Sequence, residues 1–541
     1  MVKVSIELRR DADGRLTPAP PAGDIIDTPP FPQQAKIELK NETQRKNLYH
    51  ATHTIRAKRE RVTAELDHWQ DLRSAGEAIK NRMGRHMDFY LQQLEDNLTK
   101  AGSVVHWARD AKEANEIIVN LVKATGAHEV TKVKSMATQE IDMNEALEAE
   151  NIAAWETDLA ELIVQLGHDR PSHILVPAIH RNRSEVRDIF TKEMGVYGKP
   201  APEGLDDEPV NLAAASRQHL REKFLRTSVA ISGANFAIAQ TGTLVVMESE
   251  GNGRMNLTLP QTLISVVGIE KVLPTFDDLE VFLQLLPRSS TGEREAPYVS
   301  CWTGPSAGDG PQNMHVVLID NGRTKVLSDP KGRAALRCIR CSACLNICPV
   351  YEKVGGHAYG SVYPGPIGTI LNPQLRGTDS PVDRALPFAS TLCGACNDVC
   401  PVKIPIADIL VQQRRRIVEA KKADPGPHLH LENTMMAAGG WVMADSKRLA
   451  AATTAVNLFG RIGGVFAERI GDLPIPGARL WLQARDVPMM PKYSFRSWWK
   501  GKTNPIEATQ SGNNRKLAAV VAGVAAVAVT VKAISAAKKG K

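Results

Sequence analysis

The chain has 541 residues, of which 43% are hydrophobic, 23% charged and 5% aromatic. This length predicts two or three domains, and the composition excludes a disordered chain, a collagen and a small disulfide-stapled scaffold. Residues 508–541 carry six basic side chains and no acidic one, so nearly all of the net charge of +7 lies on a tail. Because nucleic-acid binders carry their charge on a folded face, we expect no nucleic-acid partner.

The first 35 residues are polar and rich in proline, and they predict a flexible leader. They contain no apolar segment of the secretory type, which indicates a cytoplasmic protein. Apolar residues at helical spacing follow over residues 36–100. From residue 104 onward, short β-branched runs alternate with amphipathic helices, which is typical of βαβ units around a mostly parallel sheet. The runs expected as strands are residues 104–107, 128–135, 152–158, 174–178, 243–248, 263–269 and 315–322.

The pattern changes again after this α/β region. Residues 331–405 are rich in cysteine, proline and glycine with little periodicity, and a mainly helical stretch with several tryptophans follows. We expect five parts: a leader at 1–35, an α/β domain with N-terminal helices at 36–325, a cysteine-rich module at 326–410, a helical region at 411–505 and a basic apolar tail at 506–541.

The tail contains fifteen uncharged, mostly small residues at 517–531. Spanning a bilayer takes about 20 apolar residues. The run reaches that length only if it continues past Lys532 to Ala537. An anchor at the inner face of the membrane and a plain alanine-rich helix are both open. The basic flanks suit the anionic cytoplasmic leaflet in either case.

All eight cysteines fall between residues 301 and 400, which in a cytosolic chain favours metal binding over disulfides. Seven of them form two runs that each end in proline. The first run, C-x2-C-x2-C-x3-C-P, contains Cys338, Cys341, Cys344 and Cys348, and the second, C-x2-C-x3-C-P, contains Cys393, Cys396 and Cys400. A pair of zinc ribbons would need separate C-x2-C pairs without the proline. The quadruple run is typical of iron–sulfur proteins.

In two-cluster ferredoxins, the fourth cysteine of such a run binds the other cluster. The spacing therefore predicts two [4Fe–4S] clusters with exchanged ligands. The ligands expected for cluster one are Cys338, Cys341, Cys344 and Cys400, and those expected for cluster two are Cys348, Cys393 and Cys396.

Cluster two lacks a fourth cysteine in its motif, because Ser390 stands where the first run has Cys338. Three options are open: a [4Fe–4S] cluster with a non-cysteine ligand such as the Ser390 hydroxyl, a [3Fe–4S] cluster, or recruitment of Cys301. For Cys301 we favour the role of a small buried hydrophobe. Two arginines, Arg337 and Arg340, flank the first run, and they either raise the potential of the cluster or are simply solvated.

The chain resembles the lactate-utilisation protein B family of bacterial iron–sulfur proteins through nearly its whole length after the leader. The similar stretches are both cysteine runs and residues 135–147, 156–180, 241–255, 355–368 and 484–500. The resemblance implies an α/β lactate-utilisation domain of the sugar-isomerase/CoA-transferase-like type, an α-helical ferredoxin-type dicluster module and a helical C-terminal region. It implies that the seven motif cysteines bind the clusters. It also implies that companion proteins A and C take part in oxidising L-lactate to pyruvate.

The chain departs from the family pattern at one position. Where the family has a histidine after the TLP stretch, this sequence has Leu263. No role of that histidine is therefore carried over.

These features predict an electron-transfer protein that relays electrons from lactate, with partner subunits, toward a membrane or quinone-linked acceptor. No flavin or nicotinamide motif is evident in the sequence. The alternative is an acyl- or CoA-transferring enzyme with structural or sensory clusters. Its nucleophile would be Glu250 or Glu248, and Arg254 would bind an anionic group. A sharp turn with solvated acids is the interpretation we favour for this stretch. His173 and His180, which flank the expected strand at 174–178, are expected to be structural.

Overall fold

The computed structural model describes residues 28–423, 430–463, 469–470, 487–488, 495 and 499. The chain divides into two compact units, Met1–Ala420 and Lys421–Lys541. Most of the predicted leader and the whole predicted tail, with its apolar run at 517–531, lie outside the described residues. Among the helices of the described part, none combines the length and the apolar character that crossing a membrane requires.

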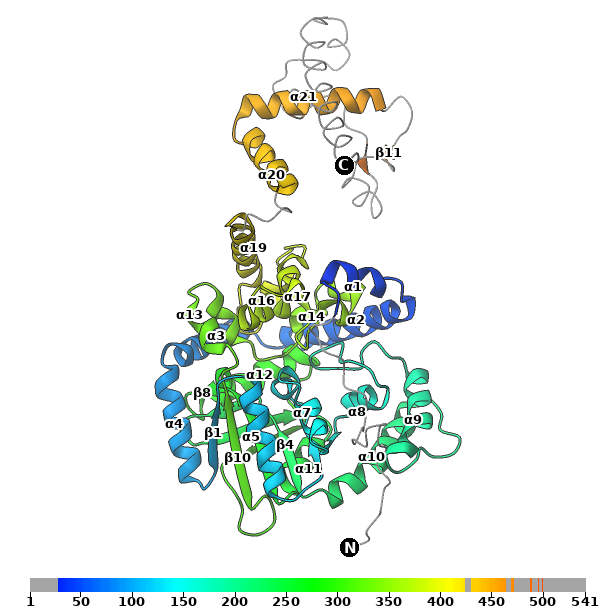
Figure 1. Cartoon of the computed structure of the whole chain (residues 1–541), viewed down its shortest axis with the longest axis vertical. Helices are drawn as coiled ribbons and strands as arrows, with labels where there is room; N and C mark the ends of the chain where they lie inside the picture. Colours follow the sequence, from blue (N-terminus) through cyan, green and yellow to red (C-terminus); the bar gives the residue numbers. More distant parts are fainter. Residues whose placement is uncertain are drawn as a thin grey trace, which may run out of the picture. The chain divides into compact units, whose positions relative to one another are not determined.

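Six strands form the central sheet of the α/β domain, in the order β1-β10-β7-β4-β2-β3 (Figure 1). In that order the strands are β1 (Val104–Ala108), β10 (Asn313–Ile319), β7 (Thr262–Gly268), β4 (Val229–Ser232), β2 (Glu129–Lys132) and β3 (Ala153–Glu156). All neighbouring pairs are parallel. Every residue of β4 and β7 is buried, as expected for central strands covered on both faces. The predicted α/β fold with a mostly parallel sheet is confirmed.

The two faces of this sheet are covered by different helices. Alternate residues of a strand point to opposite faces. Val317 of β10 packs in a core with α5 (Ala111–Ala124) and α7 (Met143–Ala149). Its neighbour Val316 packs in another core with α4 (Met87–Lys100). In Figure 1, α4 and α5 lie beside β1 and β10. The covering helices are α3 (Trp69–Arg85), α4 (Met87–Lys100), α5 (Ala111–Ala124), α6 (Met136–Glu140) and α7 (Met143–Ala149).

A smaller mixed sheet and further helices complete this domain. The sheet has the order β8-β5-β6-β9, with β8 (Val272–Leu273), β5 (Phe236–Ile238), β6 (Thr243–Glu248) and β9 (Tyr298–Trp302). Beyond β3, one core joins three helices to Trp155. These are α8 (Leu159–Leu166), α9 (Arg183–Tyr197) and α10 (Pro209–Arg226), and the domain also contains α11 (Asn252–Thr258) and α12 (Asp278–Ser290).

One predicted strand is wrong. Residues 174–178 form turns rather than a strand. The buried His173 ring stabilises the turn, because its Nδ1 accepts hydrogen bonds from the backbone N–H of Leu175 (3.1 Å) and of Val176 (3.0 Å). Pro177 has no backbone N–H to give to a sheet ladder.

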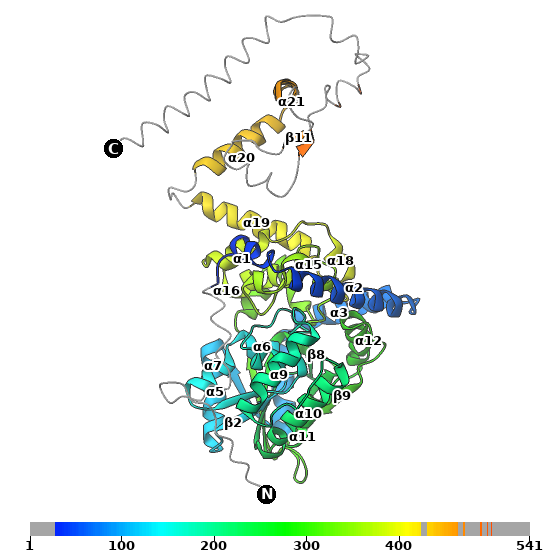
Figure 2. The same ribbon diagram turned by 90° about the vertical axis from the view of Figure 1, so that its right-hand side faces the viewer.

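Helical structure starts earlier than predicted. Helix α1 (Phe31–Glu38) begins inside the segment that we expected to be a leader. Its Phe31 ring lies 5.0 Å from the Tyr359 ring of the cysteine-rich module. Helix α2 (Glu42–Ala64) follows and packs against two helices of that module, α14 (Ala343–Asn346) and α15 (Tyr351–Val354). Figure 2 shows α1 and α2 alongside the helices of the module. The segment before the α/β domain therefore covers the cysteine-rich module.

The cysteine-rich module consists of short helices joined by tight turns. Its helices are α13 (Arg323–Ser328), α14 (Ala343–Asn346), α15 (Tyr351–Val354), α16 (Gly365–Arg376), α17 (Pro381–Ala385), α18 (Ala395–Val399) and α19 (Ile406–Ala423), and 3-10 turns lie at Gly332–Arg337, His357–Tyr359 and Leu386–Phe388. One hydrophobic core includes six of its seven motif cysteines together with residues of α2, α3 and α12. The module thus shares its core with the N-terminal helices and the α/β domain.

In the second unit, the described residues form helices α20 (His430–Met443) and α21 (Ser446–Gly463) and a short antiparallel pair, β11 (Arg469–Ile470) with β12 (Val487–Pro488). The helical C-terminal region is confirmed for this described part. Four large apolar side chains of α20 are exposed: Met435, Met436, Trp441 and Met443.

Candidate metal centre

The first cysteine run folds as a tight loop between a 3-10 turn and α14. Arg340 and Ser342 both have a φ of 64°, a left-handed conformation that reverses the direction of the chain. This loop directs three thiols, those of Cys338, Cys341 and Cys344, toward one cavity. Helix α14 then carries the chain away, and Pro349 follows the fourth cysteine of the run.

The thiol of Cys400, from the second run, lines the same cavity as these three. The remaining walls are mostly aliphatic. They include Ile174, Ile339, Ile367, Val402, Ile404 and Ile406. Two backbone amides point at sulfur atoms of this group: Arg340 N lies 3.4 Å from Cys338 Sγ, and Ile404 N lies 3.4 Å from Cys400 Sγ. Four thiols therefore converge on a dry cavity that supplies N–H donors to sulfur.

Electrostatic coupling confirms that these thiols are neighbours. Burial raises the pKa of Cys400 to about 11, and the nearby Cys338 contributes to the rise. Burial and Cys400 likewise raise the pKa of Cys341. Without bound metal, the thiols of Cys341 and Cys400 are therefore protonated at neutral pH.

The other three motif thiols form a second group. Burial, together with the nearby Cys348 and Cys393, raises the pKa of Cys396 to about 12. Burial and Cys393 also raise the pKa of Cys348, whose Sγ accepts a hydrogen bond from Tyr351 N at 3.5 Å. The last cysteine of each run thus lies with the cysteines of the opposite run. Cys393 is exposed, so this second group reaches the surface.

Cys301 does not belong to either group. It lies in β9 opposite Val245 of β6, and burial alone, with no other thiol, raises its pKa. The residue is exposed, so the expectation of a buried hydrophobe is wrong. The Ser390 hydroxyl accepts a hydrogen bond from Leu392 N at 3.1 Å. All eight cysteines are free thiols.

Arg337 and Arg340 both have defined partners. The Arg340 side chain is buried, pairs with Glu270 at 3.1 Å and stacks over the Tyr363 ring at 4.6 Å. Arg337 donates to Glu77 and to the backbone oxygen of Lys403 at 2.9 Å. The interpretation that the side chain is simply solvated is therefore wrong for Arg340. The Arg337 side chain is also mostly buried, so it is not simply solvated either.

Sequence reasoning missed the cations that the N-terminal helices bring to the first thiol group. Arg73 Nε of α3 donates to the backbone oxygen of Cys400 at 2.9 Å, and Arg59 of α2 donates to that of Val399 at 3.0 Å. Each arginine acts to lower the pKa of a nearby thiol. Arg73 does so for Cys400, and Arg59 does so for Cys341. No sequence pattern identifies these two arginines as neighbours of the thiols, because each hydrogen bond joins residues more than 300 positions apart.

The Gly-rich stretch at 248–254 is a capped turn. The Glu248 carboxylate accepts hydrogen bonds from the backbone of Gly253 (2.9 Å) and Arg254 (2.7 Å) at the start of α11. Arg254 stacks over Tyr298 at 4.9 Å. Glu250 accepts a bond from Leu159 N at 2.9 Å, and the burial of its carboxylate and the nearby Asp158 raise its pKa to about 7.

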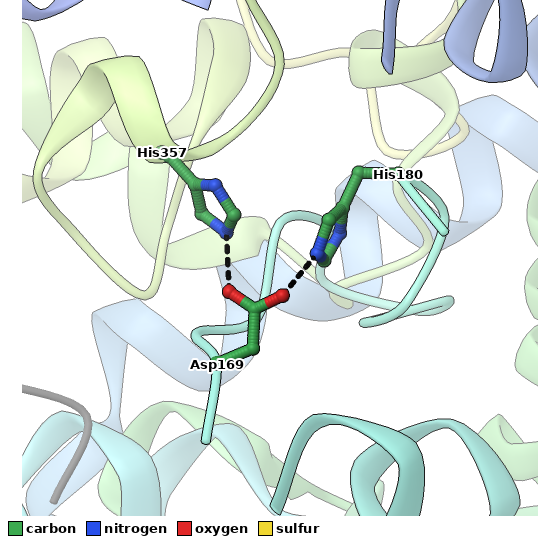
Figure 3. A group of neighbouring side chains, drawn as sticks. All are labelled: Asp169, His180 and His357. Carbon is green, nitrogen blue, oxygen red and sulfur yellow. Dashed lines mark hydrogen bonds and ion pairs between the residues drawn. The ribbon is translucent and has the colours of Figure 1, made fainter. Parts of the chain in front are cut away.

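His180 belongs to a cluster with Asp169 and His357 (Figure 3). His180 Nε2 lies 2.7 Å from Asp169 Oδ2, and His357 Nε2 lies 4.0 Å from Asp169 Oδ1. Arg181 also donates to Asp169, and His357 bonds to Arg170 O at 2.8 Å. The carboxylate is thus already neutralised, and the cluster joins the α/β domain to the cysteine-rich module. His173 is structural, as expected, because burial lowers its pKa to about 3 and both ring nitrogens have partners.

Comparison with known proteins agrees with this architecture. The family model of the LUD domain matches residues 91–319, and that of the 4Fe-4S dicluster domain matches residues 334–404. The fold and the grouped thiols therefore define an iron–sulfur protein with an N-terminal LUD domain and a dicluster module.

Lactate utilization protein B of Bacillus licheniformis is 40% identical over 484 residues, which cover 88% of this chain and 98% of that protein. The protein of the same name from Bacillus subtilis is 39% identical over 481 residues, which cover 88% of this chain and 96% of that protein. The chain belongs to the lactate utilization protein B family. A solved duf162 family protein from Deinococcus radiodurans is 14% identical with a TM-score of 0.25, and the match covers 43% of this chain and 98% of that one.

Proposed function

We propose that this chain takes part in lactate utilization as an electron-transfer protein, which relays electrons from the oxidation of L-lactate to pyruvate through two iron–sulfur clusters. The observation that carries the proposal is the grouping of seven thiols into a set of four and a set of three, each drawn from both cysteine runs. Family membership supports it, since the relatives are named for lactate utilization.

The donor set fits the proposed clusters. Thiolates are the usual ligands of [4Fe–4S] clusters, and hydrogen bonds to sulfur are among the features that tune them. We assign Cys338, Cys341, Cys344 and Cys400 to cluster one, and Cys348, Cys393 and Cys396 to cluster two. The second set supplies three thiols, so cluster two is either a [4Fe–4S] cluster with a non-cysteine ligand or a [3Fe–4S] cluster. When bound, such clusters accept and release single electrons.

The surrounding residues suit this role. Arg59, Arg73 and Arg340 place positive charge beside the first thiol group, which favours the more negative, reduced form of a cluster. The second group is accessible at Cys393, where Leu392 and Phe388 are also exposed. Electrons would therefore be exchanged with a partner at this surface.

We further propose that the companions are lactate utilization proteins A and C and that the terminal acceptor is linked to the membrane or to quinone. The basic residues around the apolar run at 517–531 support contact of the tail with the anionic inner leaflet. A cytoplasmic location is part of this proposal.

Anaerobic reconstitution of the full chain tests the cluster assignment. We expect about eight irons per chain if both clusters are [4Fe–4S], and about seven if cluster two is [3Fe–4S]. Added A and C proteins with L-lactate should bleach the visible absorption of the clusters. Stoichiometric zinc without visible charge-transfer absorption, or clusters that lactate never reduces in the presence of both companions, would contradict the proposal.

The acyl- or CoA-transferase alternative rests on Glu250, whose raised pKa is its one supporting feature. Under the electron-transfer proposal, Glu250→Gln should leave lactate-dependent bleaching unchanged. The transferase alternative wins if growth on lactate survives the loss of the seven motif cysteines but not the loss of Glu250.

A further inference from the structure

A cavity lies at the carboxyl ends of β2 and β3, away from both groups of thiols. Its volume is about 110 Å³. Helices α6, α7 and α8 and the loop at 356–362 of the dicluster module form its walls. In open α/β sheets, ligands bind beyond the carboxyl ends of the strands.

The ionisable groups that line this cavity are mostly carboxyl groups. Glu145, Glu148, Glu156 and Glu161 contribute carboxylates, and they face one lysine, Lys132. Lys132 Nζ pairs with Glu156 Oε1 at 2.6 Å, with both side chains buried, so it neutralises a single acid. Asp169 also lines the cavity, but its charge is already paired with Arg181. Arg170 is a second basic residue on the wall.

Two amide groups on the wall are oriented by neighbouring carboxylates. The Asn144 Nδ2 donates to Glu156 Oε1 at 3.0 Å, and Gln139 Nε2 donates to Glu161 Oε1 at 2.7 Å. Because an amide nitrogen must face each carboxylate, the amide oxygens point elsewhere. Asn144 Oδ1 and Gln139 Oε1 are both buried without a hydrogen-bond partner.

Two carboxylates are also incompletely paired. Glu156 Oε2 is buried without a partner, on a residue that is 4% exposed. Glu148 is 9% exposed, and its carboxylate makes neither a hydrogen bond nor an ion pair with any residue of the described part. The cavity therefore presents four sets of acceptor oxygens that lack a donor. Buried polar groups are nearly always hydrogen-bonded, so these oxygens indicate a ligand that donates.

We infer that this cavity is a binding site for a small organic cation with several N–H donors, an amine or a guanidinium compound. Such a ligand supplies both the missing donors and the missing positive charge. Lactate supplies one hydroxyl donor and adds a negative charge, so it does not match this cavity. The inference stands apart from the proposed electron relay.

The pKa values of two carboxyl groups on the cavity wall agree with a cationic ligand. Burial and Glu145 raise the pKa of Glu148 to about 8, and burial and Glu156 raise that of Glu161 to about 8. Both carboxylates therefore lack a sufficient counter-charge in the ligand-free protein. A bound cation would favour their ionised forms.

Titration calorimetry on the full chain with its clusters reconstituted tests the site. The probe is agmatine, which carries a guanidinium and an amine, and the comparison compounds are neutral 1,4-butanediol and L-lactate at the same ionic strength. We expect agmatine alone to bind. Glu148→Gln should weaken its binding at least about tenfold, because a charge-assisted hydrogen bond is lost. Glu116→Gln, at an exposed carboxylate of α5, should leave binding unchanged.

A second variant guards against misfolding. If Glu148→Gln does not fold, Glu145→Gln on the same helix should weaken agmatine binding, and circular dichroism reports the folding of each variant. Equal binding of butanediol, binding of lactate to the same site by competition, or equal affinity in the Glu148, Glu145 and Glu116 variants would overturn the inference. Absence of agmatine binding to the unmodified protein would overturn it as well.

Discussion

The guanidinium of Arg340 and the carboxylate of Glu270 form a buried ion pair, 3.1 Å apart, between the first cysteine run and the α/β domain. Their side chains are 7% and 1% exposed. Glu270 also pairs with Arg323, which donates in turn to Glu140 through two bonds of 2.9 Å. A continuous buried charge network therefore connects the first thiol group to the sheet.

Arg340→Gln should lower both stability and cluster potential. Removing one partner of a buried ion pair costs about 3–5 kcal/mol when the other charge is left unpaired. The loss should lie below this range here, because Arg323 still pairs with Glu270. Loss of the cation should also make the potential of cluster one more negative. Denaturation and redox titration of the reconstituted chain measure the two effects. The opposite change, Glu270→Gln, should destabilise the fold but make the potential less negative, and shifts of the same sign in both variants would contradict the argument.

Cys348→Ala and Cys400→Ala should have unequal effects. The assigned ligands leave only two motif thiols for cluster two in the first variant, so that cluster should be lost. Three thiols remain for cluster one in the second variant, which should retain a [3Fe–4S] form. Electron paramagnetic resonance of the two reconstituted variants distinguishes these outcomes. A Cys400 variant that keeps cluster one and loses cluster two would disprove the exchanged ligation.

Arg73 lies in α3, outside the dicluster module, yet Arg73→Gln should destabilise that module. The buried bond from Arg73 Nε to the backbone oxygen of Cys400 would be lost, and a hydrogen bond to a charged group contributes about 1.5–3 kcal/mol. The loss should appear as a lower melting temperature and as faster oxidative loss of iron. Arg61→Gln, on the exposed side of α2, is the matched control and should behave as the unmodified chain does.

Glu148 should make stability depend on pH in a predictable direction. Burial, with Glu145 and Glu156 nearby, raises its pKa from an ordinary value of 4.5 to about 8, although Lys132 acts in the opposite direction. The folded state therefore holds a proton that the unfolded chain releases between these values, so stability falls as the pH rises from about 4.5 to 8. Glu148→Gln removes this loss.

Melting temperatures of the unmodified chain and of this variant, measured from pH 5 to pH 8.5, test the sign. The advantage of the variant should grow as the pH rises. A constant or shrinking difference would show that the carboxyl is not protonated in the folded protein.

The sequence was sufficient to predict the parts of the structure that depend on local patterns. The alternation of β-branched runs and helices predicted the parallel sheet, and the cysteine spacing predicted the two groups of thiols that the fold brings together. The strand expected at 174–178 failed, because His173 caps a turn through its ring, and apolar composition alone does not reveal this. Cations such as Arg73 come from elements far from the cysteine runs in the sequence, so no local pattern contains them.

The long separation between Arg73 and Cys400 has a consequence for synthesis of the protein. Their bond joins positions 327 residues apart. Ribosomes add about 5–20 residues per second, so roughly 16–65 s pass between the appearance of the two residues. During that interval α2 and α3 have no module to cover. The core around the motif cysteines therefore closes only after the second cysteine run has been synthesised, and neither group of thiols is complete before then.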